Sequence, residues 1–201
     1  MSKKFNRDDA DKWHDNDIYV PKRSIFIGSV HVTESLEESG CDTSMAERAI
    51  KNLYLLESLS EDPITILMNN PGGDEYHMLA IYGAIKSCKS HVTIKVLGHA
   101  MSAGSVILQA ADERIMDPFS RQMIHYGTWS VDSHSKTFQK WAEEGRKIDS
   151  WMENIYLSRI REKHPNYTLA KVKKMLNHDT FLSAEESVAL GLADKVADYG
   201  E

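Results

Sequence analysis

Three side chains in separate parts of the chain have the chemistry of a catalytic triad: the hydroxyl of Ser102, the imidazole of His125 and the carboxylate of Asp179. A serine hydroxyl becomes a strong nucleophile only when a base accepts its proton, and that base is usually oriented by a carboxylate. The order Ser102, His125, Asp179 could supply all three groups. Together they would catalyse acyl transfer, with the serine attacking a carbonyl carbon.

The oxygen that becomes negative during such an attack needs two convergent hydrogen-bond donors. The backbone N–H of Ala103 directly follows the candidate nucleophile and is a natural first donor. Gly73 lies in a Pro-Gly-Gly turn, where the backbone is bare, and is a natural second donor. These two amides are therefore the candidate oxyanion hole.

The residues alone leave other assignments open. A serine that opens a helix is usually a helix cap, and a lone histidine is more often a surface or core residue. His99 and His178 flank the same motifs as the candidate base and carboxylate. Asp74 and Asp132 could orient a histidine as well as Asp179.

The segments around Ser102 predict a strand that turns directly into a helix. Apolar and polar residues alternate over residues 91–97, as on a half-buried strand, and residues 103–111 are small and aliphatic, as in a buried helix. The first turn of a helix presents unpaired N–H groups and the positive end of the helix dipole. Ser102 therefore lies at a favourable place for a nucleophile.

Strands and helices alternate over the first half of the chain. Strands are predicted at residues 25–30, 64–68 and 91–97, and helices at residues 44–59, 78–85 and 103–111. The helix from residue 44 is expected to begin with a capping box formed by Ser44 and Glu47. Two short strands follow at residues 114–116 and 122–125. This alternation predicts an α/β fold with a mostly parallel sheet.

The pattern changes in the second half, where a long helix is predicted over residues 133–165. Its apolar residues recur at steps of three and four and form a narrow stripe, which is typical of helices that pack against partner helices. It could lie on its own sheet or protrude and join subunits. The remaining chain predicts a helix at 168–176, an extended segment at 178–182, and a last helix with a Ser183–Glu186 capping box and Gly191 at its end.

Composition limits the cellular setting and the partners. The formal net charge of −6 argues against nucleic acid or an anionic membrane as the main partner, and no apolar stretch is long enough to span a membrane. Cys41 and Cys88 have no metal-type spacing, so we expect two reduced thiols in a cytoplasmic protein with no metal or other cofactor. Residues 1–20 are polar and charged and are expected to form a flexible N-terminal arm.

Four motifs together resemble the ClpP family, the proteolytic subunit of the Clp proteases. They are Asn-Asn-Pro-Gly-Gly at residues 69–73, Gly-His-Ala-Met-Ser-Ala-Gly at 98–104, Pro-Phe-Ser-Arg-Gln-Met-Ile-His at 118–125 and the segment that begins His-Asp-Thr-Phe-Leu-Ser-Ala at 178. The likeness covers roughly residues 24–198. It implies the ββα-superhelical fold shared with the crotonases, with a head of residues 21–132 and 166–198 and a protruding handle helix over 133–165.

This resemblance assigns the nucleophile to Ser102, the base to His125, the carboxylate to Asp179 and the oxyanion-hole amides to Gly73 and Ala103. It implies a self-compartmentalising serine endopeptidase that degrades unfolded proteins or peptides. It further implies self-association into one or two seven-membered rings with the active sites inside a chamber, and an AAA+ unfoldase as partner. The handle helix would be the element through which two rings meet.

The chain also departs from the family pattern. The acidic residue and arginine that usually precede the catalytic aspartate, and that link ring assembly to the active state, are Asn177 and His178 here. The Gln-Pro and glycine-rich segment that usually follows the histidine is replaced at residues 126–130, and residues 34–42 look like an inserted loop. These changes keep open a non-catalytic ring subunit that pairs with an active paralogue.

Two other enzyme classes remain as alternatives. A crotonase-type acyl-CoA enzyme shares the fold and the use of backbone amides as an oxyanion hole, and fold alone does not decide function. A relative of the Ser–Lys signal-peptide peptidases is a further alternative. The complete Ser/His/Asp set and the absence of a membrane segment in the sequence disfavour both.

Overall fold

The computed structural model describes residues 6–28, 40–128, 130, 132 and 134–199. None of the helices in this part of the chain is long and apolar enough to cross a membrane. The elements are α1 (Arg7–Asn16), β1 (Ile18–Tyr19), the 3₁₀ helix η1 (Val20–Lys22), β2 (Ser24–Ile27), α2 (Thr43–Leu59), β3 (Ile64–Asn70), α3 (Glu75–Ser87), β4 (Val92–Met101), α4 (Ala103–Leu108), β5 (Glu113–Met116), β6 (Arg121–Ile124), α5 (Ser135–Lys163), α6 (Leu169–Leu176), β7 (Thr180–Ser183), α7 (Ala184–Leu190) and β8 (Lys195–Val196).

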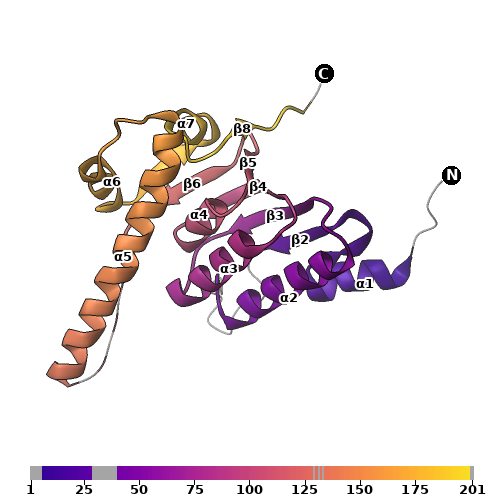
Figure 1. Ribbon diagram of the computed structural model, residues 1–201, viewed down its shortest axis with the longest axis horizontal. Helices are drawn as coiled ribbons and strands as arrows, with labels where there is room; N and C mark the ends of the chain where they lie inside the picture. The colour runs from indigo at the N-terminus through magenta and orange to yellow at the C-terminus, as the bar shows by residue number, and fades with distance from the viewer. Residues whose placement is uncertain (1–5, 29–39, 129, 131, 133, 200–201) are drawn as a thin grey trace.

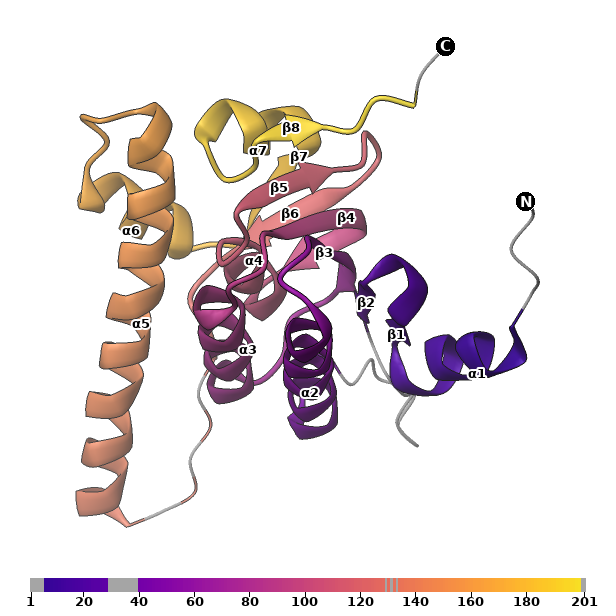
Figure 2. The ribbon, with the colours of Figure 1, turned by 45° about the vertical axis from the view of Figure 1, so that its right-hand side comes forward.

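The strands of the described residues form one sheet with the order β1-β2-β3-β4-β5-β8. The pairs between β2 and β8 along this path are parallel, and only β1 runs antiparallel to its neighbour. Alternate residues of β3 and β4 are fully buried, as the alternation of apolar and polar residues over 91–97 predicts for β4. Helices α2, α3 and α4 cover one face of this sheet (Figures 1 and 2). The expected α/β class with a mostly parallel sheet is thus observed.

Strand β4 changes its partner along its length. Its first half, Thr93 to Val96, pairs with β5, whereas its last residues, His99 to Met101, pair with β6. Strand β6 runs parallel to β4 and antiparallel to β7, so β6 and β7 form a two-stranded ribbon beside the main path of the sheet. This ribbon brings the ends of three strands together beside the start of α4.

Helix α5 is the longest helix and extends well beyond the sheet (Figures 1 and 2). All of its buried residues lie at or after Gly145, so its first turns project from the rest of the chain. Buried contacts with the core come from its second half, where Tyr156 is only 1% exposed and its hydroxyl lies 2.5 Å from the Ser105 hydroxyl of α4. The protruding helix expected over residues 133–165 is therefore observed as Ser135–Lys163.

Several local predictions differ from the structure. Part of the expected arm over residues 1–20 is helix α1, capped by the Asn6 side chain and held by edge-on contacts of Trp13 with Tyr19 and Phe26. The predicted Ser44–Glu47 capping box is wrong, because the Asp42 carboxylate accepts a hydrogen bond from the Met45 N–H at 2.8 Å and α2 begins at Thr43. A carboxylate at the cap competes successfully with a hydroxyl two residues later.

Other boundaries shift by a few residues. Strand β4 continues to Met101, past the predicted end at residue 97, and α4 ends at Leu108 rather than at 111. The predicted Ser183–Glu186 capping box is confirmed, and Gly191 ends α7 with a φ of 91°. Residues 1–5 of the predicted arm, the end of the strand predicted at 25–30 and residues 34–39 of the predicted inserted loop lie outside the described residues.

Candidate active site

Ser102 occupies the single-residue junction between β4 and α4. Its backbone has φ 50° and ψ −120°, a conformation that residues with a side chain rarely adopt and that clusters at functional sites. The junction is held by its neighbours: the Ser102 N–H donates to the Met123 carbonyl at 2.9 Å, and the Ser102 carbonyl accepts from the Ser105 N–H at 2.9 Å. Its side chain makes no capping hydrogen bond, which leaves the hydroxyl available for another partner.

That partner is His125, whose ring also contacts a carboxylate. The Ser102 Oγ lies 2.8 Å from His125 Nε2, and His125 Nδ1 lies 2.8 Å from Asp179 Oδ1. Both distances are those of good hydrogen bonds. The three residues predicted from the sequence are therefore brought together in the order that a nucleophile, its base and the base's carboxylate require.

Sheet register explains how residues so far apart in sequence meet. Met101, the last residue of β4, is opposite Met123 of β6. Ser102 directly follows β4 and His125 directly follows β6, so both lie at the same edge of the sheet. Ile124 of β6 is opposite Thr180 of β7, which places His125 beside Asp179. The β6–β7 ribbon thus presents the histidine and the carboxylate to the serine at the end of β4.

The other histidines and aspartates that the sequence left open as triad members do not take part in these hydrogen bonds. The Asp74 carboxylate caps α3 and accepts hydrogen bonds from the N–H groups of Tyr76 and His77 at 2.8 and 3.0 Å. The His99 N–H donates to the Asn69 side chain, and His178 is exposed. Asp132 lines the pocket described below but forms no part of the hydrogen-bonded chain from Ser102 to Asp179.

The two residues predicted to supply the oxyanion amides are the first residue of α4, Ala103, and Gly73, in a turn that pairs with Cys41. In the bridge between Cys41 and Gly73, the Cys41 N–H donates to the Gly72 carbonyl and the Asp74 N–H donates to the Cys41 carbonyl at 2.8 Å. This pattern leaves the N–H of Gly73 itself out of the bridge. Ala103 is the first residue of α4, so its N–H has no acceptor within the helix.

Glycine at position 72 lets the turn approach the serine closely. A Cβ on Gly72 would lie 2.7 Å from the Ser102 Cβ, and its φ of 117° is unfavourable for other residues. The turn that carries Gly73 is therefore packed directly against Ser102. Gly73 and Ala103 both line the pocket beside Ser102.

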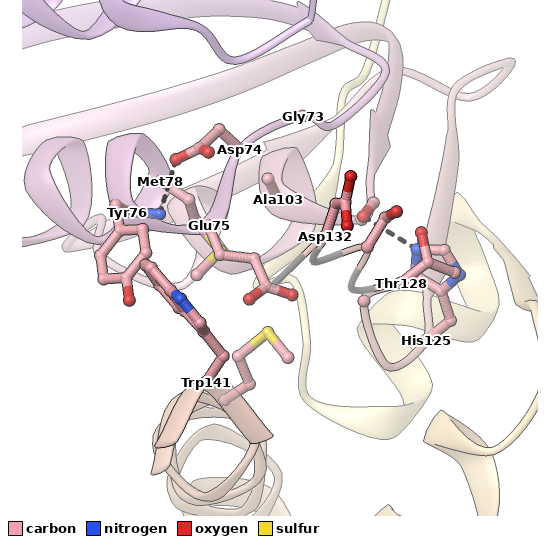
Figure 3. Close-up of a pocket in the computed structure, with 14 residues that line it drawn as sticks. Gly73, Asp74, Glu75, Tyr76, Met78, Ala103, His125, Thr128, Asp132 and Trp141 are labelled. Carbon is pink, nitrogen blue, oxygen red and sulfur yellow. Dashed lines mark hydrogen bonds between the residues drawn. The ribbon is translucent and has the colours of Figure 1, made fainter. Parts of the chain in front are cut away.

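A pocket of about 780 Å³ opens beside the hydroxyl (Figure 3). Its lining includes Gly73, Ser102, Ala103 and His125 on one side and Glu75, Met78, Asp132, Trp141 and Met152 on the other. The second group comes from the start of α3, the segment before α5 and the α5 helix itself. The pocket therefore connects the reacting atoms to a space large enough for a substrate side chain.

Carboxylates dominate the electrostatics of this region. Burial raises the pKa of Glu75 to about 7, and the negative charges of Asp149 and Asp74 contribute to that rise. Burial and Glu153 likewise raise the pKa of Asp149, despite the opposing effect of Lys173. No sequence pattern singles out Glu75, because a glutamate in the first turn of a helix is common and favoured by the helix dipole.

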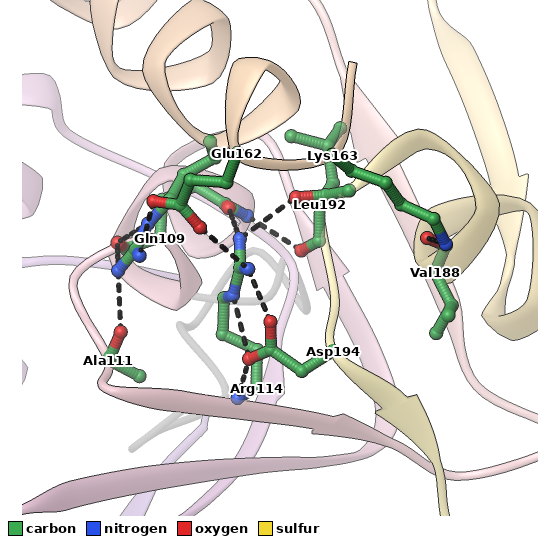
Figure 4. A network of polar contacts seen from close by, with 10 residues as sticks. Gln109, Ala111, Arg114, Glu162, Lys163, Val188, Leu192 and Asp194 are labelled. Atoms are coloured by element: carbon green, nitrogen blue, oxygen red, sulfur yellow. Dashed lines mark hydrogen bonds and ion pairs between the residues drawn. The ribbon is translucent and has the colours of Figure 1, made fainter. Parts of the chain in front are cut away.

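A buried polar network anchors the far end of α4 to the C-terminal part of the chain (Figure 4). The Arg114 guanidinium, 3% exposed, pairs with Asp194 at 2.5 Å and donates to the Gln109 side chain at 2.8 Å. Arg159 of α5 donates to the Gln109 carbonyl at 2.7 Å. This network fixes the helix whose first residue follows Ser102.

The described residues contain no group of three or more His, Cys, Asp or Glu side chains arranged to hold a metal ion. Cys41 pairs with the turn at Gly73, and burial, with the nearby Asp74 and Asp42, raises the pKa of its thiol to about 12. A thiol with so high a pKa is a poor nucleophile at neutral pH. Among the groups around the turn and the pocket, the Ser102 hydroxyl with its histidine is therefore the strongest candidate nucleophile.

Comparison with known proteins gives consistent results. A family model described as Clp protease matches residues 31–200. The ATP-dependent Clp protease proteolytic subunit of Deinococcus radiodurans is 33% identical over 188 residues, which cover 90% of this chain and 85% of that protein. Among solved structures, a ClpP1 mutant from Listeria monocytogenes superposes with a TM-score of 0.73 at 26% identity, over 89% of this chain and 93% of that one.

Proposed function

The chain belongs to the Clp protease family, as a divergent ClpP member, and from this premise we propose that it is a serine endopeptidase that uses Ser102, His125 and Asp179. The observation that carries the proposal is the continuous hydrogen-bonded chain from Ser102 Oγ through the His125 ring to Asp179 Oδ1, with both distances at 2.8 Å. Each group is already within the range needed for proton transfer.

The geometry supports the following steps. Ser102 Oγ attacks the peptide carbonyl carbon while His125 Nε2 accepts its proton, and Asp179 holds Nδ1 protonated and stabilises the imidazolium. The carbonyl oxygen, now negative, is stabilised by the N–H groups of Gly73 and Ala103. His125 then gives its proton to the leaving amine, and water releases the acyl group by the same steps in reverse.

We further propose that the chain assembles into rings and that α5 is the element through which two rings meet. Phe138, Trp141 and Trp151 of α5 are 53%, 40% and 51% exposed, a large apolar surface for a single helix. Large apolar side chains left exposed along one helix favour contact with a partner. Assembly into one or two heptameric rings, with unfolded proteins or peptides as substrates and an AAA+ unfoldase as partner, is the arrangement implied by the family resemblance.

A non-catalytic ring subunit is the second candidate, and one observation favours it. Asn177 and His178 stand where the family usually has an acidic residue and arginine, and both are exposed beside Asp179, whose side chain is 60% exposed. The carboxylate thus has little protein around it to fix its position. Such a subunit would need an active paralogue to complete the chamber.

Labelling with a fluorophosphonate tests the proposed function on the wild-type chain. We expect a single covalent adduct on Ser102, located by peptide mass spectrometry, on a particle with the mass of a heptamer or tetradecamer. Cleavage of an unfolded protein should be lost in proportion to the labelled fraction. An assembled ring that neither labels nor cleaves would favour the non-catalytic subunit, and acyl-CoA binding measured by calorimetry would favour a crotonase-type enzyme.

A further inference from the structure

Glu75 is the charged group placed deepest in the pocket beside Ser102. It is the first residue of α3 and follows the turn that carries Gly73. Figure 3 shows its carboxylate directed into the space between Trp141 and His125. A Cβ on Gly127 would collide with Glu75 Oε1, so the absence of a side chain at position 127 makes room for the carboxylate. The chain therefore places a carboxylate next to the segment that follows the catalytic histidine.

This carboxylate lacks the partners that a buried charge normally has. Glu75 Oε2 is buried, and no hydrogen bond reaches it from the described residues. Glu153, whose charge acts on Asp149, is different, because it accepts a hydrogen bond from the Tyr126 hydroxyl and pairs with Lys173 at 3.1 Å. A buried carboxylate without a partner is costly, and an incoming donor or cation would remove that cost.

The walls of the pocket suit a long cationic side chain. Met78, Met152 and Trp141 provide apolar and aromatic surface, while Glu75 and Asp132 provide negative charge. Lysine and arginine bury their methylene groups against apolar surface and keep the charged end at a polar site. No lysine or arginine is among the described residues that line the pocket, so the negative charge there is not already neutralised from within it.

We propose that Glu75 is a specificity-determining residue that makes the pocket select substrates with a lysine or arginine next to the scissile bond. The inference rests on the proposed function, because it assigns the pocket to the substrate of the Ser102 nucleophile. Glu75 accepts the hydrogen bonds of the substrate's ammonium or guanidinium group. Asp132 adds negative charge at the more exposed side of the same pocket.

Cleavage-site mapping and matched peptides test this assignment. We expect wild-type digests of a denatured protein to show lysine and arginine enriched on one side of the cleaved bonds. Glu75→Gln keeps the size of the side chain and removes its charge. It should reduce kcat/KM for a basic peptide about 10- to 100-fold relative to a matched peptide with a neutral side chain at that position, as expected for hydrogen bonds to a charged group.

Controls separate this inference from the proposed function. Glu61→Gln changes an exposed glutamate outside the pocket, and it should leave fluorophosphonate labelling, cleavage of the neutral peptide and the preference unchanged. The effect of Glu75→Gln is measured as the ratio of kcat/KM for the basic peptide to that for the neutral peptide, so a general loss of activity does not count as a change of specificity. The specificity assignment is overturned if wild type labels and cleaves without enrichment of basic residues, or if Glu75→Gln retains the preference for the basic peptide. The proposed protease activity is unaffected by either result. If wild type does not label, the proposed function itself fails.

The preference should also depend on pH. Burial, with the charges of Asp149 and Asp74, raises the pKa of Glu75 to about 7. Lowering the pH through this value therefore protonates the Glu75 carboxylate of the free enzyme. The ratio of kcat/KM for the basic peptide to that for the neutral peptide should therefore fall as pH falls from about 8 to 6. Effects of pH on the reaction steps that the two peptides share cancel in the ratio. A ratio that stays constant over this range in wild type would contradict the role of the Glu75 charge.

Discussion

Replacing Ser102 with alanine is expected to lower kcat for peptide cleavage by about a millionfold, the scale seen when a triad nucleophile is removed. The hydroxyl that forms the acyl bond is lost, and His125 has no proton to accept from it. Covalent labelling by a fluorophosphonate should disappear for the same reason. The measurement is initial-rate cleavage of a fluorogenic peptide together with intact-mass analysis after labelling.

Folding and assembly should be unchanged by Ser102→Ala. Alanine is smaller than serine, and the side chain makes no capping hydrogen bond, so only its contact with His125 is removed. Ser58→Ala provides a matched control, because Ser58 is an exposed serine on α2, away from the pocket, and should retain full activity. Persistent labelling of the Ser102→Ala protein would show that another residue is the nucleophile.

Replacing Asp194 with alanine is expected to lower the free energy of unfolding by about 3 kcal/mol, at the low end for a broken buried ion pair because this carboxylate is 37% exposed. The Arg114 guanidinium is 3% exposed and would keep the Glu162 carboxylate only at the longer distance of 3.6 Å, besides the neutral acceptors Gln109 and the Gly191 carbonyl. A buried charge that loses its close, hydrogen-bonded counter-charge is costly. Urea denaturation at one fixed protein concentration measures the loss.

The pH dependence of that loss provides a second readout. Burial alone raises the pKa of Asp194, but hydrogen bonds and charge from Arg114 outweigh it and leave the pKa below its ordinary value. The stabilisation is therefore present above the ordinary carboxylate pKa of about 4 and is lost as pH falls through the lower folded value. The difference between wild type and Asp194→Ala should shrink in acid. Glu113→Gln, which breaks the exposed Lys195 pair, should cost less than about 1 kcal/mol.

Much of the fold could be predicted from local patterns, because alternation and capping act within a few residues. The parallel sheet, the junction at Ser102, the long helix and the capping box at Ser183 all followed from such signals, and the ClpP-type fold implied by the family motifs is confirmed by the structural comparison. Helix α1 was missed because its stability depends on the packing of Trp13 against Tyr19 and Phe26. That contact is not visible in a polar, charged segment.

Residue types suggest that Ser102, His125 and Asp179 act together, but they do not determine that the three side chains meet. Their meeting depends on the switch of β4 from β5 to β6 and on the pairing of Ile124 with Thr180, which are long-range register choices. The pocket is harder still to predict. Its lining residue Glu75 belongs to α3, whereas Trp141 and Met152 belong to α5, and only the tertiary arrangement brings the two helices to the same pocket.

The β6–β7 ribbon carries both His125 and Asp179, whereas Ser102 belongs to the main path of the sheet. The contact between imidazole and carboxylate lies at the end of the ribbon, whereas the contact between imidazole and hydroxyl crosses from the ribbon to the end of β4. That crossing is held by the pairing of β4 with β6 and by the hydrogen bond from the Ser102 N–H to the Met123 carbonyl. The backbone ladder between these two strands therefore sets the distance over which the serine proton is transferred.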